Sequence, residues 1–150
     1  MVPKITEIAS GYLPQVLKYL EKNKLLALAT VSGDTPWIAN VFFAYDKNCN
    51  LFIFSKEDTR HSGYIKENAR VAVGIHQFWG KSFSVKGLQL IGRANKVNKK
   101  EFTRFFPIYL RRYPWAVRFL KDHVLYKIES KEIYYIDQEL FGHFNRVRIK

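Results

Sequence analysis

The sequence predicts a mainly β protein of the α+β class, an antiparallel barrel of six or seven strands with a few peripheral helices. Short runs rich in β-branched and aromatic residues recur along the chain, and turn-forming residues separate most of them. Most connections are short enough for hairpins, and the repeated strand–helix–strand units of a doubly wound nucleotide-binding fold are missing. With 150 residues, the chain has room for one domain with its own core, so residues 1–150 are interpreted as a single domain.

The first half of the chain is expected to alternate between strands and tight turns, with two helices. Pro14 is best tolerated in the first turn of a helix, so the apolar stripe at the N-terminus becomes a regular helix near Leu13. Residues 32–36 and 46–50 are rich in turn-forming residues that separate strands. In chain order, the expected elements are a helix at Leu13–Asn23, strands at Leu25–Val31, Trp37–Tyr45 and Leu51–Ser55, a helix at Thr59–Asn68 and a strand at Val71–Ile75.

The second half is expected to supply one long strand, a broken helix and two closing strands. Gly87 and Gly92 predict bends or bulges within the long strand. The helix is expected to break at Tyr113, because a residue that precedes proline is disfavoured in the helical region. The expected elements are a turn at Gly80–Ser82, a strand at Phe83–Val97, a helix at Lys99–Lys121, and strands at Val124–Ile128 and Ile133–Asp137 joined by a turn at residues 130–132.

The start of the Thr59–Asn68 helix is a candidate binding site for an anion. Asp58 or Thr59 can cap this helix, because a side-chain oxygen accepts from N–H groups of the first turn. Arg60 and His61 fall in that turn, where the helix dipole and the free N–H groups already favour a negative charge. A phosphate site is therefore one interpretation of the pattern, and an ordinary capped surface helix with an exposed arginine is the alternative.

The chain is strongly basic, with a formal net charge of +12 at pH 7 from 25 Lys and Arg and 13 Asp and Glu. The excess is concentrated in residues 93–121, where Glu101 is the one acid. Such a charge distribution attracts nucleic acid, anionic lipid or a phosphorylated ligand, although it also occurs in basic proteins without such partners. The basic residues of this segment are Arg93, Lys96, Lys99, Lys100, Arg104, Arg111, Arg112, Arg118 and Lys121.

Several classes of site find no support in the sequence. The four histidines are scattered and Cys49 is the one cysteine, so no metal site or disulfide framework is expected. No nucleophile elbow is present, and we assign no catalytic residue. If the protein is an enzyme, its chemistry is expected to come from a cofactor. The N-terminus has no signal-peptide pattern and no apolar run is long enough to cross a bilayer, so a cytoplasmic location without a membrane partner is expected.

Three segments resemble the pyridoxamine 5′-phosphate oxidase-like FMN-binding split-barrel superfamily. They are LALATVSGDTPWIANVFFAYD, LFIFSKEDTRHSGYIKENARVAVGI and KGLQLIGRANKV, and the resemblance extends over residues 20–137. Further similarity to a small, poorly characterised bacterial branch lies in Arg111-Arg112-Tyr113-Pro114, in YKIESKEIYYID and in Phe141-Gly142. The resemblance implies a split β-barrel and a homodimer in which the subunits share an FMN site.

The resemblance also implies a set of cofactor-binding residues. FMN would lie against the backbone of Ile38–Phe43, and its phosphate would be held at the start of the short helix. The strand around Lys86–Gln89 would lie near the edge of the flavin ring, and the tail at Phe141–Arg146 would reach the pocket of the partner. The implied residues are Ala39, Asn40, Val41, Phe42, Phe54, Ser55, Thr59, Arg60, His61, Lys86, Gly87, Gln89, Phe141, His143 and Arg146.

The sequence departs from the superfamily pattern at several of its functional positions. Ile38 and Phe43 replace basic residues, and Ile136 replaces an aromatic residue in the last strand. His61 replaces the usual lysine, so a permanent charge becomes a conditional one. If His61 contacts the phosphate as a cation, FMN affinity should fall as the pH rises through the imidazole titration. These departures argue against pyridoxamine phosphate as the substrate.

The expected function is therefore that of a small FMN-dependent oxidoreductase that acts on an unidentified small molecule. Three alternatives remain open: a flavin carrier without enzymatic activity, a basic domain associated with nucleic acid, and a haem-binding protein. The last alternative arises because some relatives bind haem, and His143, His61 or His76 would then be the axial ligand.

Overall fold

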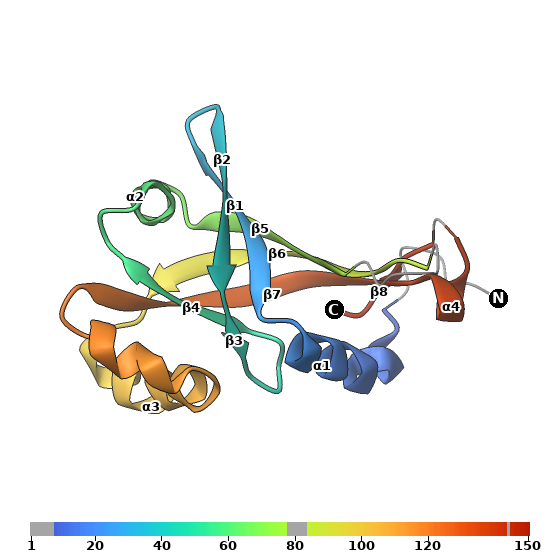
Figure 1. The fold of residues 1–150 in the computed structure, drawn as a ribbon. Coiled ribbons are helices and arrows are strands. Elements are labelled where there is room, and N and C mark those ends of the chain that lie inside the picture. Colours follow the sequence, from blue (N-terminus) through green and yellow to red (C-terminus); the bar gives the residue numbers. More distant parts are fainter. Residues whose placement is uncertain (1–7, 78–83, 144) are drawn as a thin grey trace.

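The computed structural model describes residues 8–77, 84–143 and 145–150, which form an antiparallel sheet curled into a half-barrel (Figure 1). This confirms the predicted mainly β architecture with few helices. The sheet order is β2 (Thr35–Phe42), β1 (Leu25–Ser32), β5 (Arg70–Gln77), β6 (Lys86–Lys96), β7 (His123–Asp137), β4 (Leu51–Lys56) and β3 (Ala44–Tyr45), and the short strand β8 (Val147–Arg148) pairs with β7. The predicted turn at Gly80–Ser82 and the predicted strand start at Phe83 lie outside the described residues.

The inner face of the sheet carries the main hydrophobic core. Successive residues of a strand point to opposite faces, so every second residue is buried. Leu28 on β1, Val73 on β5 and Leu90 on β6 are each at most 4% exposed. Burial of such apolar side chains is the main stabilising contribution to the fold.

Within the described residues, no helix covers the centre of the opposite face of β2, β1, β5 and β6, and we call it the outer face (Figure 1). Its central row consists of residues that are direct partners across the four strands, namely Ile38, Ala29, Ala72 and Ile91. Ile38 is 62% exposed and Ile91 is 47% exposed. The outer face therefore presents small and apolar side chains to the solvent.

One prediction was wrong at the end of the sheet: β7 is one continuous strand of 15 residues and not two strands joined by a turn. Tyr126 and Ile128 face the core before residues 130–132, and Ile133 and Tyr135 face it afterwards. The residues that face the core thus have even numbers before the turn-like segment and odd numbers after it, and this change made the sequence resemble two strands. The cause is a β-bulge, because Gly92 pairs with Ser130 and Ile91 with Glu132, which leaves Lys131 as the extra residue.

Gly92 allows the close approach of the two strands at this bulge. A Cβ atom at Gly92 would lie 2.4 Å from the carbonyl oxygen of Glu129, a backbone atom that cannot swing away. We therefore expect Gly92→Ala to destabilise the protein by about 1–3 kcal/mol, the usual cost of overpacking.

Urea unfolding at a fixed protein concentration tests this expectation. Gly74→Ala is the matched control, because Gly74 lies on the neighbouring strand β5 and a Cβ atom there would meet nothing within 4 Å. The control should leave the stability unchanged or raise it slightly by restricting the unfolded chain. Equal urea midpoints for the two variants would show that the bulge does not need glycine.

The helices cover the open sides of the half-barrel. In Figure 1, α1 and α3 lie below the sheet and α2 lies above it. The predicted break at Tyr113 is confirmed, since α3 ends at Arg112 and a 3₁₀ helix begins at Pro114. The helical elements are η1 (Ser10–Tyr12), α1 (Leu13–Lys22), α2 (Arg60–Glu67), α3 (Lys99–Arg112), η2 (Pro114–Phe119) and α4 (Gln138–Phe141).

Arg112 at the end of α3 ties this helix to the end of α1. Its Nη2 atom donates hydrogen bonds to the carbonyl oxygens of Leu20 and Glu21, each at 3.0 Å, and to that of Asn23. The guanidinium also lies 4.9 Å from the ring centre of Phe43. One side chain therefore donates to three carbonyl groups at the end of the helix, of which that of Leu20 also accepts from the backbone N–H of Asn23.

Two further details differ from the prediction. The expected strand Trp37–Tyr45 is interrupted at Phe43, whose side chain is fully buried, and β2 already begins at Thr35. Gly87 pairs regularly with His76, so the expected irregularity occurs at Gly92 and not there. In the tail, Phe141 is buried in the core and β8 pairs with β7. The predicted reach of the tail into the pocket of a partner stays a prediction.

Candidate functional site

The N-terminus of α2 gathers the residues that were predicted to hold a phosphate. Thr59 is the capping residue, with extended backbone angles, and its side chain accepts a hydrogen bond from the backbone N–H of Ser62. The Oγ1 atom of Thr59 lies 2.7 Å from the Oγ atom of Ser62, which in turn donates to the carbonyl of Lys56. The first turn is thereby held in place against the end of β4.

His61 is part of this cluster, but it is buried and not exposed to a ligand as a free cation. Its Nε2 atom lies 2.8 Å from Ser55 Oγ and 3.2 Å from Thr59 Oγ1. Burial lowers the pKa of the His61 imidazole below its ordinary value, because desolvation disfavours the charged form. The ring is therefore neutral at pH 7, and the permanent positive charge of this turn comes from Arg60.

This burial should make the protein less stable in mildly acidic solution. The unfolded chain binds a proton at His61 near pH 6.5, whereas the folded chain resists protonation. The contribution of His61 to stability is therefore complete above about pH 6.5 and is lost as the pH falls towards the lowered pKa of the folded state. Urea unfolding between pH 5 and pH 7.5 should show a smaller pH dependence for His61→Gln than for the parent protein. The exposed His76 provides the control variant His76→Gln, and equal pH dependence of the two variants would contradict the expectation.

Arg60 projects from the first turn of α2 and lies over two aromatic rings. Its Cζ atom is 4.5 Å from the ring centre of Trp37 on β2 and 5.8 Å from that of Tyr64, one turn further along the helix. Within the described residues, Arg60 forms no ion pair. Stacking leaves the edge of the guanidinium, with its N–H groups, available for an anion.

The predicted flavin-contacting strand is β2, which lies at an edge of the sheet. It pairs with β1 over its full length and forms no ladder on its other side within the described residues. Asn40 and Phe42 are on the outer face with Ile38, whereas Ala39 and Val41 are half-buried on the opposite face. An edge strand offers unpaired backbone groups to a ligand or to another chain.

A second group of predicted residues gathers on the outer face, at the other end of the sheet. The Nη1 atom of Arg146 lies 3.5 Å from the side-chain oxygen of Gln89 on β6, and its guanidinium lies 5.6 Å from the ring centre of Tyr134. Gly87 is two residues from Gln89 on the same face. His143 is exposed in the tail after α4.

Three of the predicted residues belong to neither group. Phe54 faces α3, with its ring 5.3 Å from that of Phe106. Lys86 forms ion pairs with Asp137 at 3.7 Å and Glu139 at 3.5 Å. Phe141 is buried, and its ring makes an edge contact with Tyr12. These side chains support the fold in this subunit, and their predicted contact with a cofactor remains a prediction.

Sequence reasoning missed Trp37 and Tyr64, which lie beneath Arg60. Tyr64 is four residues after Arg60, so helical spacing could have placed the two side chains on one face. Trp37 lies on a distant strand, and no local pattern connects it with Arg60. The aromatic floor of the candidate site therefore comes partly from long-range packing.

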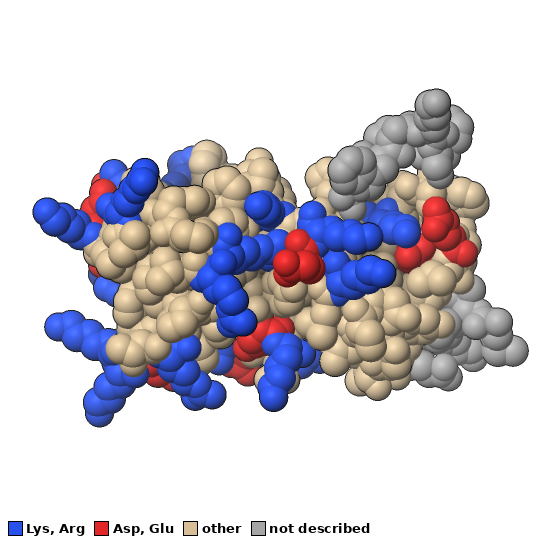
Figure 2. All heavy atoms as spheres, turned by 60° about the horizontal axis from the view of Figure 1, so that its bottom comes forward, with Lys and Arg blue, Asp and Glu red and all other residues tan. Residues whose placement is uncertain are grey.

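The basic segment at residues 93–121 does not form one surface. Arg93 lies on the outer face of β6, Lys96 forms an ion pair with Glu57 at 2.9 Å, and Arg112 binds the end of α1. On the face shown in Figure 2, Lys and Arg lie in several separate groups with uncharged surface between them. The basic side chains of this segment therefore lie in separate places and do not form one continuous patch.

Within the described residues, no cluster of three or more His, Cys, Asp or Glu side chains is arranged to hold a metal ion. In the same part of the chain, no helix combines the length and the apolar character that crossing a membrane requires.

Comparison with known proteins agrees with this arrangement of strands and helices. Residues 13–137 match the family of pyridoxamine 5′-phosphate oxidase. The chain belongs to this family. Among curated relatives, a UPF0306 protein of Klebsiella pneumoniae is 30% identical over 132 residues, which cover 87% of this chain and 88% of the relative.

Solved structures with the same fold include proteins with different ligands. A FAD-binding protein from Mesorhizobium loti superposes with a TM-score of 0.69 at 17% identity, covering 83% of this chain and 91% of the other. A haem storage protein from Vibrio cholerae superposes with a TM-score of 0.72 at 18% identity, covering 86% of this chain and 95% of the other. At these identities the similarity establishes that this member of the oxidase family has their fold.

Proposed function

We propose that this protein binds FMN, with the phosphate at the N-terminus of α2, and that it acts as a flavin-dependent oxidoreductase on a small molecule. The observation that carries the proposal is the arrangement of Arg60, Thr59 and Ser55 around the first turn of that helix. Membership of the pyridoxamine 5′-phosphate oxidase family supports the same ligand class.

The residues at this turn fit a phosphate group chemically. The first N–H groups of a helix have no partners within the helix, and they carry the positive end of its dipole. Thr59 uses its side chain for the N–H of Ser62, which leaves those of Arg60 and His61 for a ligand. Glu57, a nearby acid, is held in an ion pair with Lys96. The turn therefore offers donors and a cation to an anionic group.

The remaining parts of FMN would extend along the edge strand β2. Its free edge offers backbone donors and acceptors to the flavin ring, and Ile38 supplies an apolar contact. When bound, the flavin would accept and deliver electrons or hydride, so the protein needs to bind and orient the ring and to exclude water. His61 is neutral and forms hydrogen bonds with hydroxyl groups. It would therefore hold the first turn of α2 in position and would not contribute a positive charge to the phosphate site.

The absorption spectrum of the freshly purified protein tests this proposal, since flavin and haem absorb differently. Titration with FMN and with riboflavin, followed by quenching of protein fluorescence, then tests the phosphate site. FMN should bind far more tightly than riboflavin, and Trp37 beneath Arg60 provides a nearby fluorophore. FMN affinity should stay constant from pH 7 to pH 8, because burial lowers the pKa of the His61 imidazole and keeps the ring neutral there. Equal affinity for FMN and riboflavin would refute the phosphate site.

The proposed flavin site is shared between two subunits that meet through the outer face. Leu25, Ile38 and Phe42 are 53%, 62% and 44% exposed, and they lie on adjacent strands of this face. An apolar surface of this kind is typical of an interface, and a two-fold dimer is the commonest assembly. Within its own subunit, Arg146 already lies on the outer face, where its Nη1 atom is 3.5 Å from the side-chain oxygen of Gln89. A tail residue in this position would contact the partner across the interface.

Sedimentation at micromolar concentration should therefore give about twice the 17.7 kDa mass of the chain. Ile38→Asp should shift the protein towards the monomer, because it places a charge in the interface. Val117→Asp is the matched control, since Val117 is 52% exposed on η2 and is not a residue of the outer face, although Trp115 of the same helix packs against Phe42. A strict monomer that binds FMN with full stoichiometry would exclude a shared site.

Haem binding is a second candidate function because His76 is accessible on the outer face. This histidine is exposed on β5, and its direct partner Gly87 has no side chain that would cover it. The solved haem storage protein of the same fold also supports this candidate. A Soret band that disappears in His76→Ala would establish it, and a flavin spectrum would exclude it as the main function.

A further inference from the structure

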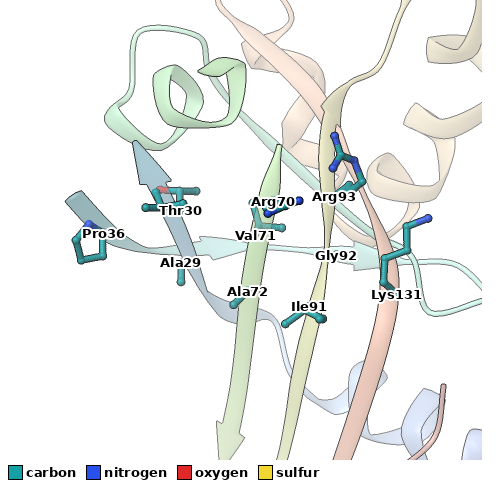
Figure 3. Close-up of a pocket in the computed structure, with 11 residues that line it drawn as sticks. Ala29, Thr30, Pro36, Arg70, Val71, Ala72, Ile91, Gly92, Arg93 and Lys131 are labelled. Atoms are coloured by element: carbon teal, nitrogen blue, oxygen red, sulfur yellow. The ribbon is translucent and has the colours of Figure 1, made fainter. Parts of the chain in front are cut away.

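Two pockets lie on different sides of the molecule. The first is on the outer face, where Figure 3 shows Ala29, Ala72 and Ile91 along its floor, and the subunit interface proposed above would cover it. The second has a volume of about 610 Å³ and lies between α1 and α3, at the short strand β3; in Figure 1 both helices are below the sheet. Among the described residues that line this second pocket, none belongs to the four strands of the outer face, so the proposed interface does not include it.

The second pocket, which we call the α1–α3 pocket, combines an apolar lining with charged side chains. Leu17 of α1, Ala44 of β3 and Ile108 of α3 supply apolar surface, and Tyr45 of β3 adds an aromatic ring. The volume is within the range of small-molecule sites, which are mainly apolar with a few polar groups that orient the ligand. The charged residues of the lining are Glu21, Asp46, Lys47, Arg111 and Arg112.

The two acidic residues of the α1–α3 pocket already have hydrogen-bond donors. The Oε2 atom of Glu21 accepts from the Tyr45 hydroxyl at 2.5 Å. Burial and this hydrogen bond raise the pKa of Tyr45 to about 12, so the hydroxyl keeps its proton at pH 7. Asp46 accepts from the backbone N–H groups of Asn48 and Asn50, each at 2.9 Å, and from the Asn50 side chain at 3.0 Å. Within the described residues, neither carboxylate forms an ion pair.

The three cations of the α1–α3 pocket also form no ion pair in the part of the chain that the structure describes. Lys47 and Arg111 are exposed, and Arg112 is half-buried. The Nη2 atom of Arg112 serves the carbonyl groups at the end of α1, but its Nη1 atom is buried and has no hydrogen-bond partner among the described residues. A buried donor without an acceptor is costly, so an anion gains more at this guanidinium than at a solvated cation.

We propose that the α1–α3 pocket binds a small molecule with one carboxylate group and an apolar body. The apolar body would lie against Leu17, Ala44 and Ile108. The carboxylate would pair with the guanidinium of Arg112, whose planar donors match its geometry, and Lys47 and Arg111 would add to the attraction.

The charge of the α1–α3 pocket favours a carboxylate over a phosphate. Its three cations and two carboxylates leave one formal positive charge, which a single negative charge on the ligand balances. A phosphate dianion would exceed this charge and would be repelled by the carboxylates of Glu21 and Asp46.

The inference does not rest on flavin binding. The proposed flavin phosphate site is at the start of α2, and no described residue of that helix lines the α1–α3 pocket. A ligand of this pocket would contact α1 and α3 together, so it should stabilise the folded protein in proportion to its occupancy.

Isothermal titration of the purified protein in its native oligomeric state tests the proposal with four probes. These are 1-naphthoate, 1-naphthol, acetate and 1-naphthyl phosphate. The naphthoate should bind about tenfold more tightly than naphthol, which lacks the charge, and than acetate, which lacks the apolar body. It should also bind more tightly than naphthyl phosphate. Equal affinity for acetate or naphthol would overturn the proposal, and tighter binding of the phosphate would overturn the carboxylate as the head group.

A double variant, Lys47→Gln with Arg111→Gln, should weaken naphthoate by about tenfold and should lose the rise in Tm that naphthoate causes in the parent protein. The matched control is Lys100→Gln with Arg104→Gln, which removes the same charge from exposed positions of α3 outside the pocket. Arg112 stays unchanged in both, because its hydrogen bonds hold the end of α1. Equal weakening in the two double variants would show a general attraction by the basic chain and would overturn the site.

A final measurement distinguishes this pocket from the proposed flavin site. Arg60→Ala should bind naphthoate as tightly as the parent protein, and saturating FMN should leave naphthoate affinity unchanged. Loss of naphthoate binding in Arg60→Ala, or displacement of naphthoate by FMN, would overturn a separate site.

Discussion

Arg112→Leu should lower the free energy of unfolding by about 2–4 kcal/mol, the largest effect expected of a single substitution here. The variant keeps an apolar stem over Phe43 but removes the donor to the carbonyl groups of Leu20, Glu21 and Asn23. Hydrogen bonds from a charged donor are stronger than neutral ones, and a carbonyl group that loses its donor in a half-buried place bears the cost of desolvation. The carbonyl of Leu20 still accepts from the backbone N–H of Asn23, so this cost falls on those of Glu21 and Asn23. The end of α1 should therefore loosen from α3.

Urea unfolding followed by circular dichroism at one protein concentration measures this loss. Arg111→Leu is the matched control, because Arg111 is exposed on the neighbouring position of the same helix. Its effect should stay within about 0.5 kcal/mol, as for most surface substitutions. Arg112→Lys should give an intermediate value, since an ammonium group can serve some of the carbonyls but lacks the planar guanidinium that packs on Phe43. Similar midpoints for the two leucine variants would exclude the proposed link between the helices.

Arg60→Ala should weaken FMN binding by about 1.5–3 kcal/mol, which corresponds to a factor of about 10 to 150 in Kd. The substitution removes the permanent charge of the α2 first turn, while Thr59 still caps the helix. Riboflavin binding should change little, because riboflavin lacks the phosphate. The loss should therefore abolish most of the preference for FMN over riboflavin.

Lys66→Ala is the control for Arg60→Ala, because it removes the same charge from the last turn of the same helix. It should leave FMN affinity within about twofold of the parent, since the effect of a helix terminus on an anion is confined to the first turn. Fluorescence titration at two salt concentrations measures both variants. If Lys66→Ala weakened FMN as much as Arg60→Ala, a general attraction by the basic chain would explain the binding and a defined phosphate site would not.

The local start of α2 could be predicted from the sequence because it depends on neighbouring residues. Thr59 caps the helix through an N–H group three residues away, and the break after Arg112 follows from Pro114. Such interactions join residues within a single turn, so the residues that determine them are neighbours in the sequence. The mainly β architecture was also predictable, because the spacing of apolar runs and turns repeats along the chain.

The β-bulge in β7 could not be predicted from the sequence in this way. Lys131 inserts one residue into β7, and a shift of one residue sends every following side chain to the other face. The sequence pattern records the change of phase but not its cause, which is the pairing with Gly92 on another strand. A turn and a bulge therefore look alike until the partner strand is known.

The sequence thus established the strand content, the capped helix and the cationic residue at its start, all through interactions within a few residues. The tertiary structure decided that His61 is buried beside Ser55, that Trp37 lies beneath Arg60 and that Arg70 stands opposite Arg93. It also bound Arg112 to a carbonyl group 92 residues away in the chain. These neighbours are brought together by strand register and helix packing, which depend on the whole chain burying its apolar side chains at once, and no short segment contains that information.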